Sequence, residues 1–374
     1  MLKQIIYADN AATTKLSKKA YEAMQPYLLE EYGNPSQPYS FSRSTKKALI
    51  EARETIASCI GAYPEEIFFT SGGTESDNWV IKGIGLYNQK KGAILTSAIE
   101  HHAILRSCHA VEELGFPVAY MWPTEHGEIT PSILTKYITD TTKLVSVMYV
   151  NNEIGTIQSI KELCEISHAH GALFHTDAVQ AVGHLQMDVH DLGIDFLSAS
   201  AHKFNGPRGI GFFYIRKGVL LSPFMHGGAQ EHGMRGGTEN TAQIVGMATA
   251  LKENCDNMRN HTQHISQLED IFFRTLNSSG ITYIRNGIHQ MPGIISLSFP
   301  NQDGEALLHR LDLHRIYVST GSACDSKSTE LSHVLKSIQL DEIFAKGTIR
   351  ISFGHNNSNE DAKTLALELI KIVK

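Results

Sequence analysis

Short apolar runs alternate with amphipathic stretches between residues 67 and 215. The seven runs cover residues 67–70, 93–96, 117–121, 144–150, 172–175, 194–198 and 209–215. Most are separated by helix-length amphipathic segments, such as 78–87, 102–114 and 160–170. This alternation predicts a doubly wound, largely parallel α/β sheet with helices on both faces. The last run follows the sixth without an intervening helix, so we expect it to be antiparallel.

A long helical pattern follows this α/β region. Apolar residues recur at spacings of three, four or seven from Ile244 to Phe272, which is longer than one compact layer requires. Shorter strand and helix units come after it and end with a helix over residues 359–373. We therefore expect a large α/β domain at residues 16–258. A smaller α+β domain would combine residues 1–15 with 259–374, so that the N-terminal strand rejoins it.

Composition and charge narrow the class of protein. The chain has 374 residues, a formal net charge of -6 and no apolar run long enough to span a membrane. These values argue against nucleic acid or an anionic membrane as a main partner. The N-terminus lacks signal-peptide anatomy, and the five scattered cysteines form neither a disulfide framework nor a metal-binding spacing. We expect a cytoplasmic protein without a bound metal.

Polar segments follow five of the apolar runs. In open α/β sheets, ligands bind at the carboxyl ends of the strands, so these segments are expected to converge on one site. In chain order they are SGGTESDN, SAIEHHA, NNEIG, HTDAVQ and SASAHK. Any one of them could be a turn or a helix cap, and their convergence is the evidence for a site.

Lys203 lies in the last of these segments, just after a strand. An amine among small and polar residues can attack a carbonyl near neutral pH, whereas a solvated surface lysine is the alternative. Residues 71–74, which precede a helix, could hold a phosphate through backbone N–H groups and the Thr74 hydroxyl, or could simply cap the helix. Asp177 is expected to be buried and to need a cationic partner, either a protonated heterocyclic nitrogen or an arginine.

Three further residues carry candidate chemistry. His101 and His102 are adjacent and cannot share a helix face, so one ring that stacks or transfers protons is favoured over a zinc pair. Cys324 lies in a polar, glycine-containing segment, so it is a candidate nucleophile, while the other cysteines fit helix faces. Arg350 lies inside an apolar strand and needs a carboxylate, from a ligand or from a structural ion pair.

Taken together, the chain resembles the fold-type I pyridoxal-phosphate enzymes and, within them, the cysteine desulfurases. Ten collinear segments carry the resemblance along nearly the whole chain. They are YADNAATT, GNPS, FFTSGGTESDN, EHHA, VNNEIG, HTDAVQ, SAHKFNGPRGIG, HGGAQEHGMRGGT, STGSAC and IRIS.

The resemblance implies a role for each matching residue. Lys203 would bind pyridoxal 5'-phosphate covalently and move protons, and Asp177 would pair with its ring nitrogen. His101 would stack on the ring and help to activate the substrate thiol. The remaining cofactor contacts would come from Gly73, Thr74, Gln180, Ser200 and His202, and from Thr238 of a neighbouring subunit.

The same resemblance implies the substrate and the partners. The carboxylate of L-cysteine would be bound by Arg350, with the help of Asn152 and Asn34. Cys324 would take up the sulfur as a persulfide, alanine would be released, and an acceptor or iron–sulfur scaffold protein would receive the sulfur. A homodimer is expected, with sites at the subunit interface. STGSAC resembles the subgroup with a long catalytic loop, which serves iron–sulfur assembly and nitrogenase maturation.

Alternatives and departures remain at this point. An aminotransferase or a selenocysteine lyase would share Lys203 and Asp177, so only Cys324 and its loop separate them from a desulfurase. A non-catalytic scaffold protein is a further alternative, which the intact lysine, aspartate and cysteine disfavour. The chain departs from the family pattern at Lys15, Ser40 and His232, which leaves the acceptor and the subgroup open.

Overall fold

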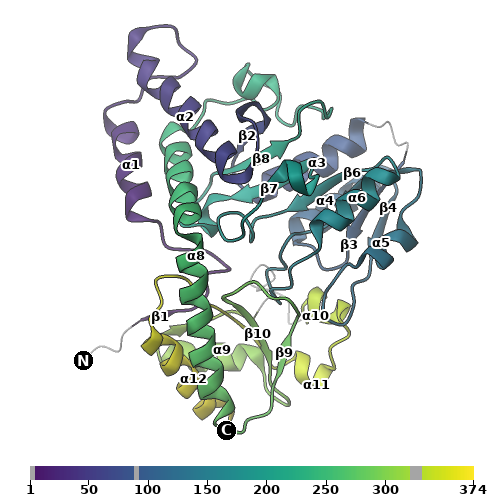
Figure 1. Cartoon of the computed structure of the whole chain (residues 1–374), viewed down its shortest axis with the longest axis vertical. Coiled ribbons are helices and arrows are strands. Elements are labelled where there is room, and N and C mark those ends of the chain that lie inside the picture. The colour runs from purple at the N-terminus through teal and green to yellow at the C-terminus, as the bar shows by residue number, and fades with distance from the viewer. Residues whose placement is uncertain (1–4, 88–91, 321–330) are drawn as a thin grey trace.

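A seven-stranded sheet forms the larger part of the molecule. The computed structural model describes residues 5–87, 92–320 and 331–374 of the chain. The strands of the sheet lie in the order β2-β8-β7-β6-β5-β3-β4 (Figure 1). Their bounds are β2 Ile67–Thr70, β3 Ala93–Ser97, β4 Val118–Met121, β5 Thr142–Ser146, β6 Leu173–Asp177, β7 Phe196–Ser200 and β8 Gly211–Ile215. Only β8 runs against its neighbours β2 and β7, which confirms the predicted antiparallel strand.

Helices cover both faces of this sheet, as the alternating pattern predicts. They are α1 Lys18–Leu29, α2 Arg43–Ile60, α3 Gly73–Tyr87, α4 His102–Glu113, α5 Pro131–Tyr137, α6 Ile160–Ala169 and α7 Val189–Leu192. Consecutive strand residues belong to different apolar clusters: Phe68 and Ile94 pack with α3 and α4, whereas Phe69 and Leu95 pack with α2 and α6. Since the sheet is buried on both faces, its strands read as continuous apolar runs.

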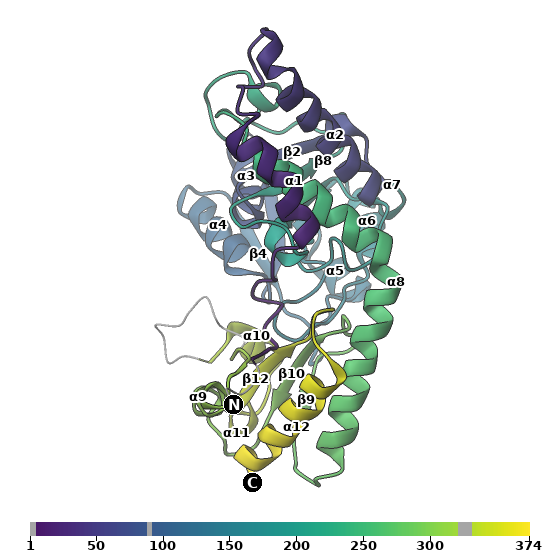
Figure 2. The same ribbon diagram turned by 90° about the vertical axis from the view of Figure 1, so that its left-hand side faces the viewer.

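The long helix α8, Thr241–Asn277, links the large sheet to a smaller sheet at the other end of the molecule (Figures 1 and 2). The smaller sheet has the antiparallel order β12-β10-β9, with bounds Thr348–Ser352, Ile294–Ser298 and Ile284–Asn286. The N-terminal strand β1, Ile6–Tyr7, pairs in parallel with β11, Ile316–Tyr317, so it does rejoin this part. The exact domain boundaries stay a prediction.

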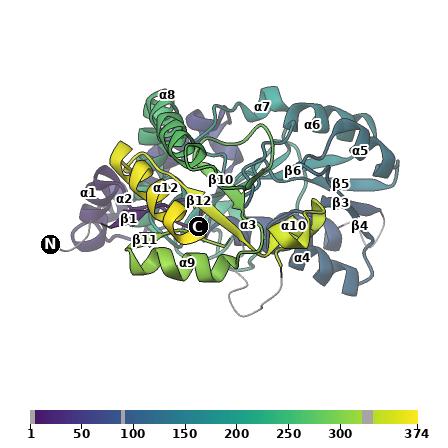
Figure 3. The ribbon, with the colours of Figure 1, turned by 90° about the horizontal axis from the view of Figure 1, so that it is seen from below.

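A separate apolar cluster holds the smaller part together. Buried residues of α8 such as Leu268 and Phe272 pack against β10 and β12 and against the closing helix α12, Asn359–Val373. Helix α12 lies alongside the lower half of α8, as Figures 2 and 3 show. The remaining helices are α9 Gly304–Leu313, α10 His333–Ser337 and α11 Glu342–Ala345. Among the described residues, no helix is both long enough and apolar enough to cross a membrane.

One buried ion pair fixes the glycine-rich segment 226–240 to the large sheet. Glu231 accepts hydrogen bonds from Arg53 Nη1 at 2.9 Å, from Arg53 Nη2 at 2.6 Å and from the backbone N–H of Phe69 at 2.9 Å. Its side chain is only 3% exposed, and its backbone is left-handed, with φ of 45°. A non-glycine residue holds that conformation only when its surroundings enforce it.

Replacing Glu231 with alanine should lower the free energy of unfolding by about 3–5 kcal/mol, because the Arg53 guanidinium would stay buried without its carboxylate. Chemical denaturation of the purified protein measures this change. Glu51→Ala is the matched control on α2, since the Lys47–Glu51 pair is exposed. It should change stability by less than about 1 kcal/mol. Equal effects of the two variants would contradict a structural role for the Arg53–Glu231 pair.

Candidate active site

A cavity of about 420 Å³ lies where the carboxyl ends of the large sheet face the smaller part. Its walls come from segments far apart in the sequence: the N-terminal segment, the ends of β6 and β7, the starts of α3, α4 and α10, and strand β12. The residues that bear on function are Ala11, Ala12, Gly73, Thr74, Asp77, His101, His102, Asn152, Glu153, Asp177, Gln180, Ser200, His202, Lys203, His333 and Arg350. The expected convergence of the strand-end segments is therefore observed.

Lys203 ends a short 3-10 turn, Ala201–Lys203, that follows β7. Its ammonium group donates to the carbonyl oxygens of Ala11 at 2.5 Å and Ala12 at 2.9 Å. The chain can turn sharply behind it because Gly206 approaches Ala201 so closely that a Cβ would lie 2.8 Å from the Ala201 Cβ. Lys203 lines the cavity and is partly buried, so the interpretation as a solvated surface lysine is wrong.

Asp177 is the last residue of β6 and points into the cavity. Its Oδ1 accepts the backbone N–H of Val179 at 2.9 Å. Burial raises the pKa of Asp177 to about 6, although the Val179 hydrogen bond and the nearby Lys203 charge oppose this shift. Within the described ranges no arginine pairs with Asp177, so the structural-arginine alternative finds no support. A cationic group in the cavity would satisfy this carboxylate.

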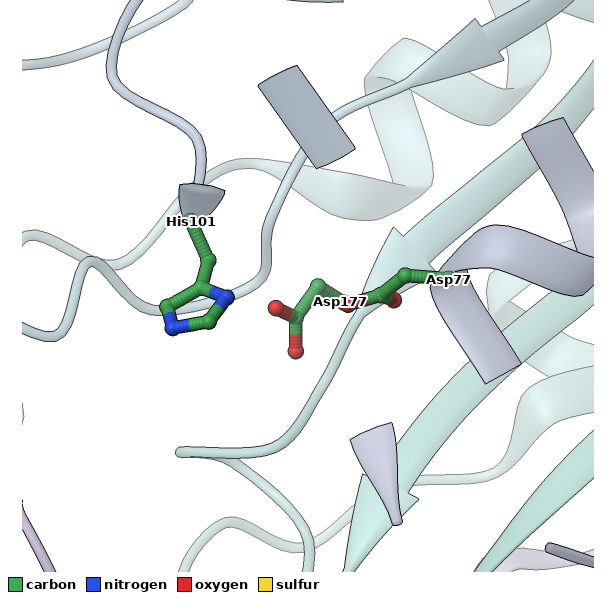
Figure 4. A group of neighbouring side chains, drawn as sticks. All are labelled: Asp77, His101 and Asp177. Atoms are coloured by element: carbon green, nitrogen blue, oxygen red, sulfur yellow. The ribbon is translucent and has the colours of Figure 1, made fainter. Parts of the chain in front are cut away.

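Asp77, which the strand-end motifs did not single out, lies on α3 behind Asp177 (Figure 4). The side chain of Ser198 hydrogen-bonds to Asp77, and Ser198 Oγ also lies 3.0 Å from His175 Nε2. Burial, together with the charge of Asp177, holds the pKa of Asp77 well above its usual range. Burial and the charge of Asp177 therefore disfavour the ionised form of Asp77, while Lys203 and the Val179 N–H favour the ionised form of Asp177.

His101 is the N-cap residue of α4, and its Nδ1 accepts the backbone N–H of Ala103 at 3.1 Å. This hydrogen bond leaves the ring proton of the neutral imidazole on Nε2. Burial lowers the pKa of His101 to about 4, and the charge of Lys203 adds to the effect. Figure 4 shows the His101 ring directed toward the Asp177 carboxylate. His101 is consequently a neutral ring at the cavity wall.

Side-chain donor atoms of Asp77, His101 and Asp177 all lie within 4.8 Å of one another, a spacing that a metal ion could occupy. Three donors fall short of a closed tetrahedral set, and a metal would require both carboxylates to be ionised. The raised pKa of Asp77, caused by burial, disfavours that state. The trio therefore fits a cationic organic group better than a metal ion, and the prediction that no metal is bound stays a prediction.

An anion cradle adjoins this cavity at the start of α3. Thr74, Ser200 and His202 line it, and a Cβ on Gly73 would lie 2.6 Å from Val179 Cγ2, so only glycine fits there. Glu75 satisfies the backbone N–H of Ser71 at 2.7 Å. In the described part of the chain, the Thr74 and Ser200 hydroxyls bond no protein group, which argues against simple capping by Thr74.

Two residues of this cradle were not predicted. Thr13 Oγ1 lies 3.1 Å from His202 Nδ1, and Arg208 Nε donates to the same hydroxyl at 3.4 Å. Both residues line the cradle. Burial, with the charges of Lys203 and Arg208, lowers the pKa of His202 to about 4, so the ring is neutral. The GPRG turn after Lys203 was a signal for Arg208, because it brings the chain back to the same strand end.

Arg350 of β12 lies at the wall supplied by the smaller part. Its Nη2 donates to Asp9 Oδ1 at 2.7 Å and its Nη1 to the Asn152 carbonyl at 2.9 Å. The side chain is 3% exposed, and its Nε is buried without a hydrogen-bond partner. Gln180 also reaches the cavity, with its amide nitrogen bonded to the Ala11 carbonyl at 2.9 Å. The structural ion pair expected for Arg350 is present, yet its buried Nε has no acceptor.

Two predicted site residues do not line this cavity, and a third is not described. Thr238 is exposed, and Asn34 uses its side-chain oxygen to accept the Ser36 backbone N–H at 2.9 Å. Neither lines the cavity. Cys324 lies outside the described residues. The cavity formed by the described residues of one chain therefore lacks Thr238 and Asn34.

The three departures from the family pattern lie away from the cavity. Lys15 and Ser40 are exposed, and Lys15 contributes only its carbonyl to Asn205 at 2.9 Å. His232 is exposed, with φ of 57°, and its ring packs edge-on against Phe68 at 6.3 Å between ring centres. None of the three lines the cavity.

Known proteins share both the sequence and the fold of this chain. The family model named aminotransferase class-V matches residues 6–365. A cysteine desulfurase IscS from Dictyoglomus turgidum is 46% identical over 363 residues, covering 96% of this chain and 92% of that protein. A solved NifS-like protein covers 99% of both chains with a TM-score of 0.93 and 35% identity.

A structure described as SspA in complex with cysteine covers 94% of this chain and all of that one. Its TM-score is 0.83 and its sequence identity is 34%. These matches span nearly the whole chain and confirm the resemblance that the ten collinear segments carry. The chain belongs to the class-V aminotransferase family and, within it, to the cysteine desulfurases.

Proposed function

We propose that this protein is a cysteine desulfurase that uses pyridoxal 5'-phosphate to remove sulfur from L-cysteine. The products would be L-alanine and a persulfide on Cys324. One observation carries the proposal: Lys203, the Asp177 carboxylate and the Arg350 guanidinium face a single cavity. An amine, an anion and a cation in this arrangement suit a cofactor with an aldehyde and a basic ring nitrogen, together with a substrate carboxylate.

The residues present fit the cofactor. Thr74 and Ser200 offer hydroxyl groups that bond no protein partner among the described residues, and the amino end of α3 favours a phosphate. Gly73, His202 and, beyond the predicted set, Thr13 and Arg208 complete the cradle. Asp177 would pair with the protonated ring nitrogen, Gln180 would bond the ring oxygen, and Lys203 would bind the aldehyde carbon covalently. When bound, the cofactor supplies an electron sink.

Arg350 would hold the carboxylate of L-cysteine. Asp9 and the Asn152 carbonyl already fix the orientation of its guanidinium, and the buried Nε has no partner. A buried donor without an acceptor is costly, so an entering carboxylate removes that cost. Asn152 also lines the cavity and would add an amide contact. Asn34 does not line the cavity of its own chain, so it would contact the substrate only in the site of a partner subunit.

Proton transfers and sulfur capture would use different residues. Lys203 would move the proton at Cα of the substrate, and His101, neutral because burial lowers its pKa, would exchange the proton of the substrate thiol. The Cys324 thiolate would attack the substrate sulfur, forming the S–S bond as the Cβ–S bond breaks. Cβ would then gain a proton, which gives alanine.

A homodimer would complete the site. Thr238 is exposed and lies outside the cavity of its own chain, as expected of a residue that contacts the cofactor phosphate of a partner subunit. The end of α1 and the turn after it expose large apolar side chains at Leu28, Leu29, Tyr32, Tyr39 and Phe41. Such clustered exposure is typical of a protein interface. A sulfur-acceptor or iron–sulfur scaffold protein would then take the persulfide sulfur.

Incubation of the holoenzyme with L-cysteine tests the function directly. We expect a mass increase of one sulfur on the peptide that contains Cys324, together with stoichiometric alanine.

Cys324→Ala should keep the visible absorbance of the bound cofactor and lose sulfide release. Lys203→Ala should lose both the turnover and the covalent, borohydride-reducible link to the cofactor. Full turnover by Cys324→Ala would refute the persulfide mechanism, and a colourless wild type after cofactor addition would refute the cofactor.

Arg350→Ala should raise the KM for L-cysteine roughly 10–100-fold, because charge-assisted hydrogen bonds worth about 1.5–3 kcal/mol would be lost. Steady-state kinetics of sulfide release measure the effect, and the absorbance of the bound cofactor should stay at the wild-type level. Arg274→Ala, at an exposed position near the end of α8, is the matched control and should leave KM unchanged. An unaltered KM in Arg350→Ala would contradict the carboxylate-binding role.

Cofactor affinity of the cofactor-free protein should fall as the pH drops below about 6. Burial raises the pKa of Asp177 to about 6, so the carboxylate is ionised above that pH and neutral below it, where it cannot pair with a protonated ring nitrogen. Equilibrium dialysis between pH 5 and 8 measures the dissociation constant. The cofactor phosphate titrates in the same range for every variant. The Asp177 contribution is therefore the difference between wild type and Asp177→Asn, and parallel pH profiles would contradict it.

A further inference from the structure

Two cysteines outside the active site lie side by side where helices α2 and α8 pack together. Cys59 is in the last turn of α2, and Cys255 is in the first half of α8. Helices α2 and α8 pack directly on each other, and the two thiols are close enough for each to shift the pKa of the other. Both side chains are partly buried against the same apolar cluster, and neither lines the cavity that contains Lys203. Two neighbouring thiols on different helices can react with each other as well as pack in the core.

The environment of the pair distinguishes one thiol from the other. The hydrogen bond from Cys59 lowers the pKa of Cys255, and the nearby Lys252 ammonium lowers it further, against the effects of burial and of Asp256. The same hydrogen bond and burial raise the pKa of Cys59. Cys255 is accordingly the thiol that reaches the reactive thiolate form first, with Cys59 as its neighbour.

The pair is also within reach of solvent. A groove of about 330 Å³ runs between α2 and α8, and its lining includes Thr55, Lys252 and Asp256. Thr55 precedes Cys59 by one helical turn, while Lys252 and Asp256 flank Cys255. Both cysteines are less buried than Cys108 and Cys164, which are single thiols in the core whose pKa values burial raises. Since both side chains are partly exposed next to this groove, a small oxidant can approach the pair.

We propose that Cys59 and Cys255 are an oxidisable thiol pair that forms a reversible disulfide between α2 and α8 upon reaction with a hydroperoxide. The Cys255 thiolate attacks the peroxide oxygen, which gives a sulfenic acid and releases water or an alcohol. The Cys59 sulfur then attacks the sulfenic sulfur, and a second product, water, leaves. In total, two thiols lose two electrons and two protons, and one peroxide is reduced. A dithiol reductant reverses the reaction.

Peptide mapping of the folded holoenzyme tests the proposal. Trypsin places Cys59 in the peptide 54–82 and Cys255 in the peptide 253–259, each with one cysteine. After treatment with hydrogen peroxide and blocking of free thiols, most of the two peptides should be recovered as one cross-linked species. Reduction should separate them. The oxidised protein should melt several degrees higher than the reduced one, because the link closes a long loop.

Matched variants separate this pair from the catalytic cysteine. Cys59→Ser and Cys255→Ser should each abolish the cross-link and the gain in melting temperature. Cys324→Ser should retain both, because Cys324 takes no part. Recovery of the two peptides unlinked from peroxide-treated, folded wild type would overturn the proposal. A cross-link from either peptide to Cys324 instead would overturn it as well. None of these readouts depends on desulfurase activity, so the proposal stands or fails independently of the proposed function.

Discussion

Two backbone carbonyl groups hold the ammonium group of Lys203, and much of the site depends on this contact. Both carbonyls belong to the N-terminal segment, from Ala11 and Ala12, and the Ala11 carbonyl also accepts a bond from Gln180. A few residues earlier, Asp9 pairs with Arg350 of the smaller sheet. One short segment thus contacts the lysine of the large sheet and the arginine of the small one. The relative position of these two groups is set by backbone geometry as well as by side chains.

Buried acids surround the same cavity, and they cannot all be charged. Burial raises the pKa of Glu100 to about 8, and burial together with the charge of Asp177 holds the pKa of Asp77 well above its usual range. Lys203 and the Val179 backbone N–H favour the ionised form of Asp177. The environment therefore favours the negative charge on Asp177 over that on Asp77, although both line the cavity. The raised pKa values of Asp77 and Glu100 favour their neutral forms, which compete less with Asp177 for a cation.

Sequence reasoning predicted the fold more completely than it predicted the residues of the site. The strand order places Lys203, Asp177 and the 71–74 turn at one edge, so the strand-end rule found them. Asp77 lies in the predicted strand-end segment SGGTESDN but was not singled out, because a polar residue within a helix carries no periodic signal that separates a buried acid from a solvated one. Ala11 and Ala12 act through their backbones, which a sequence pattern does not reveal. Thr238 and Asn34 do not line the cavity of their own chain, and their site roles stay a prediction that depends on the proposed dimer.

The exposed position of Thr238, outside the cavity of its own chain, has a genetic consequence in the proposed dimer. Each site would combine Lys203 of one subunit with Thr238 of the other. In a mixed dimer of a Lys203 variant and a Thr238 variant, both defects fall in one site and the second site is intact. Two inactive alleles of this gene would therefore complement each other when expressed together, with activity in proportion to the mixed dimers formed.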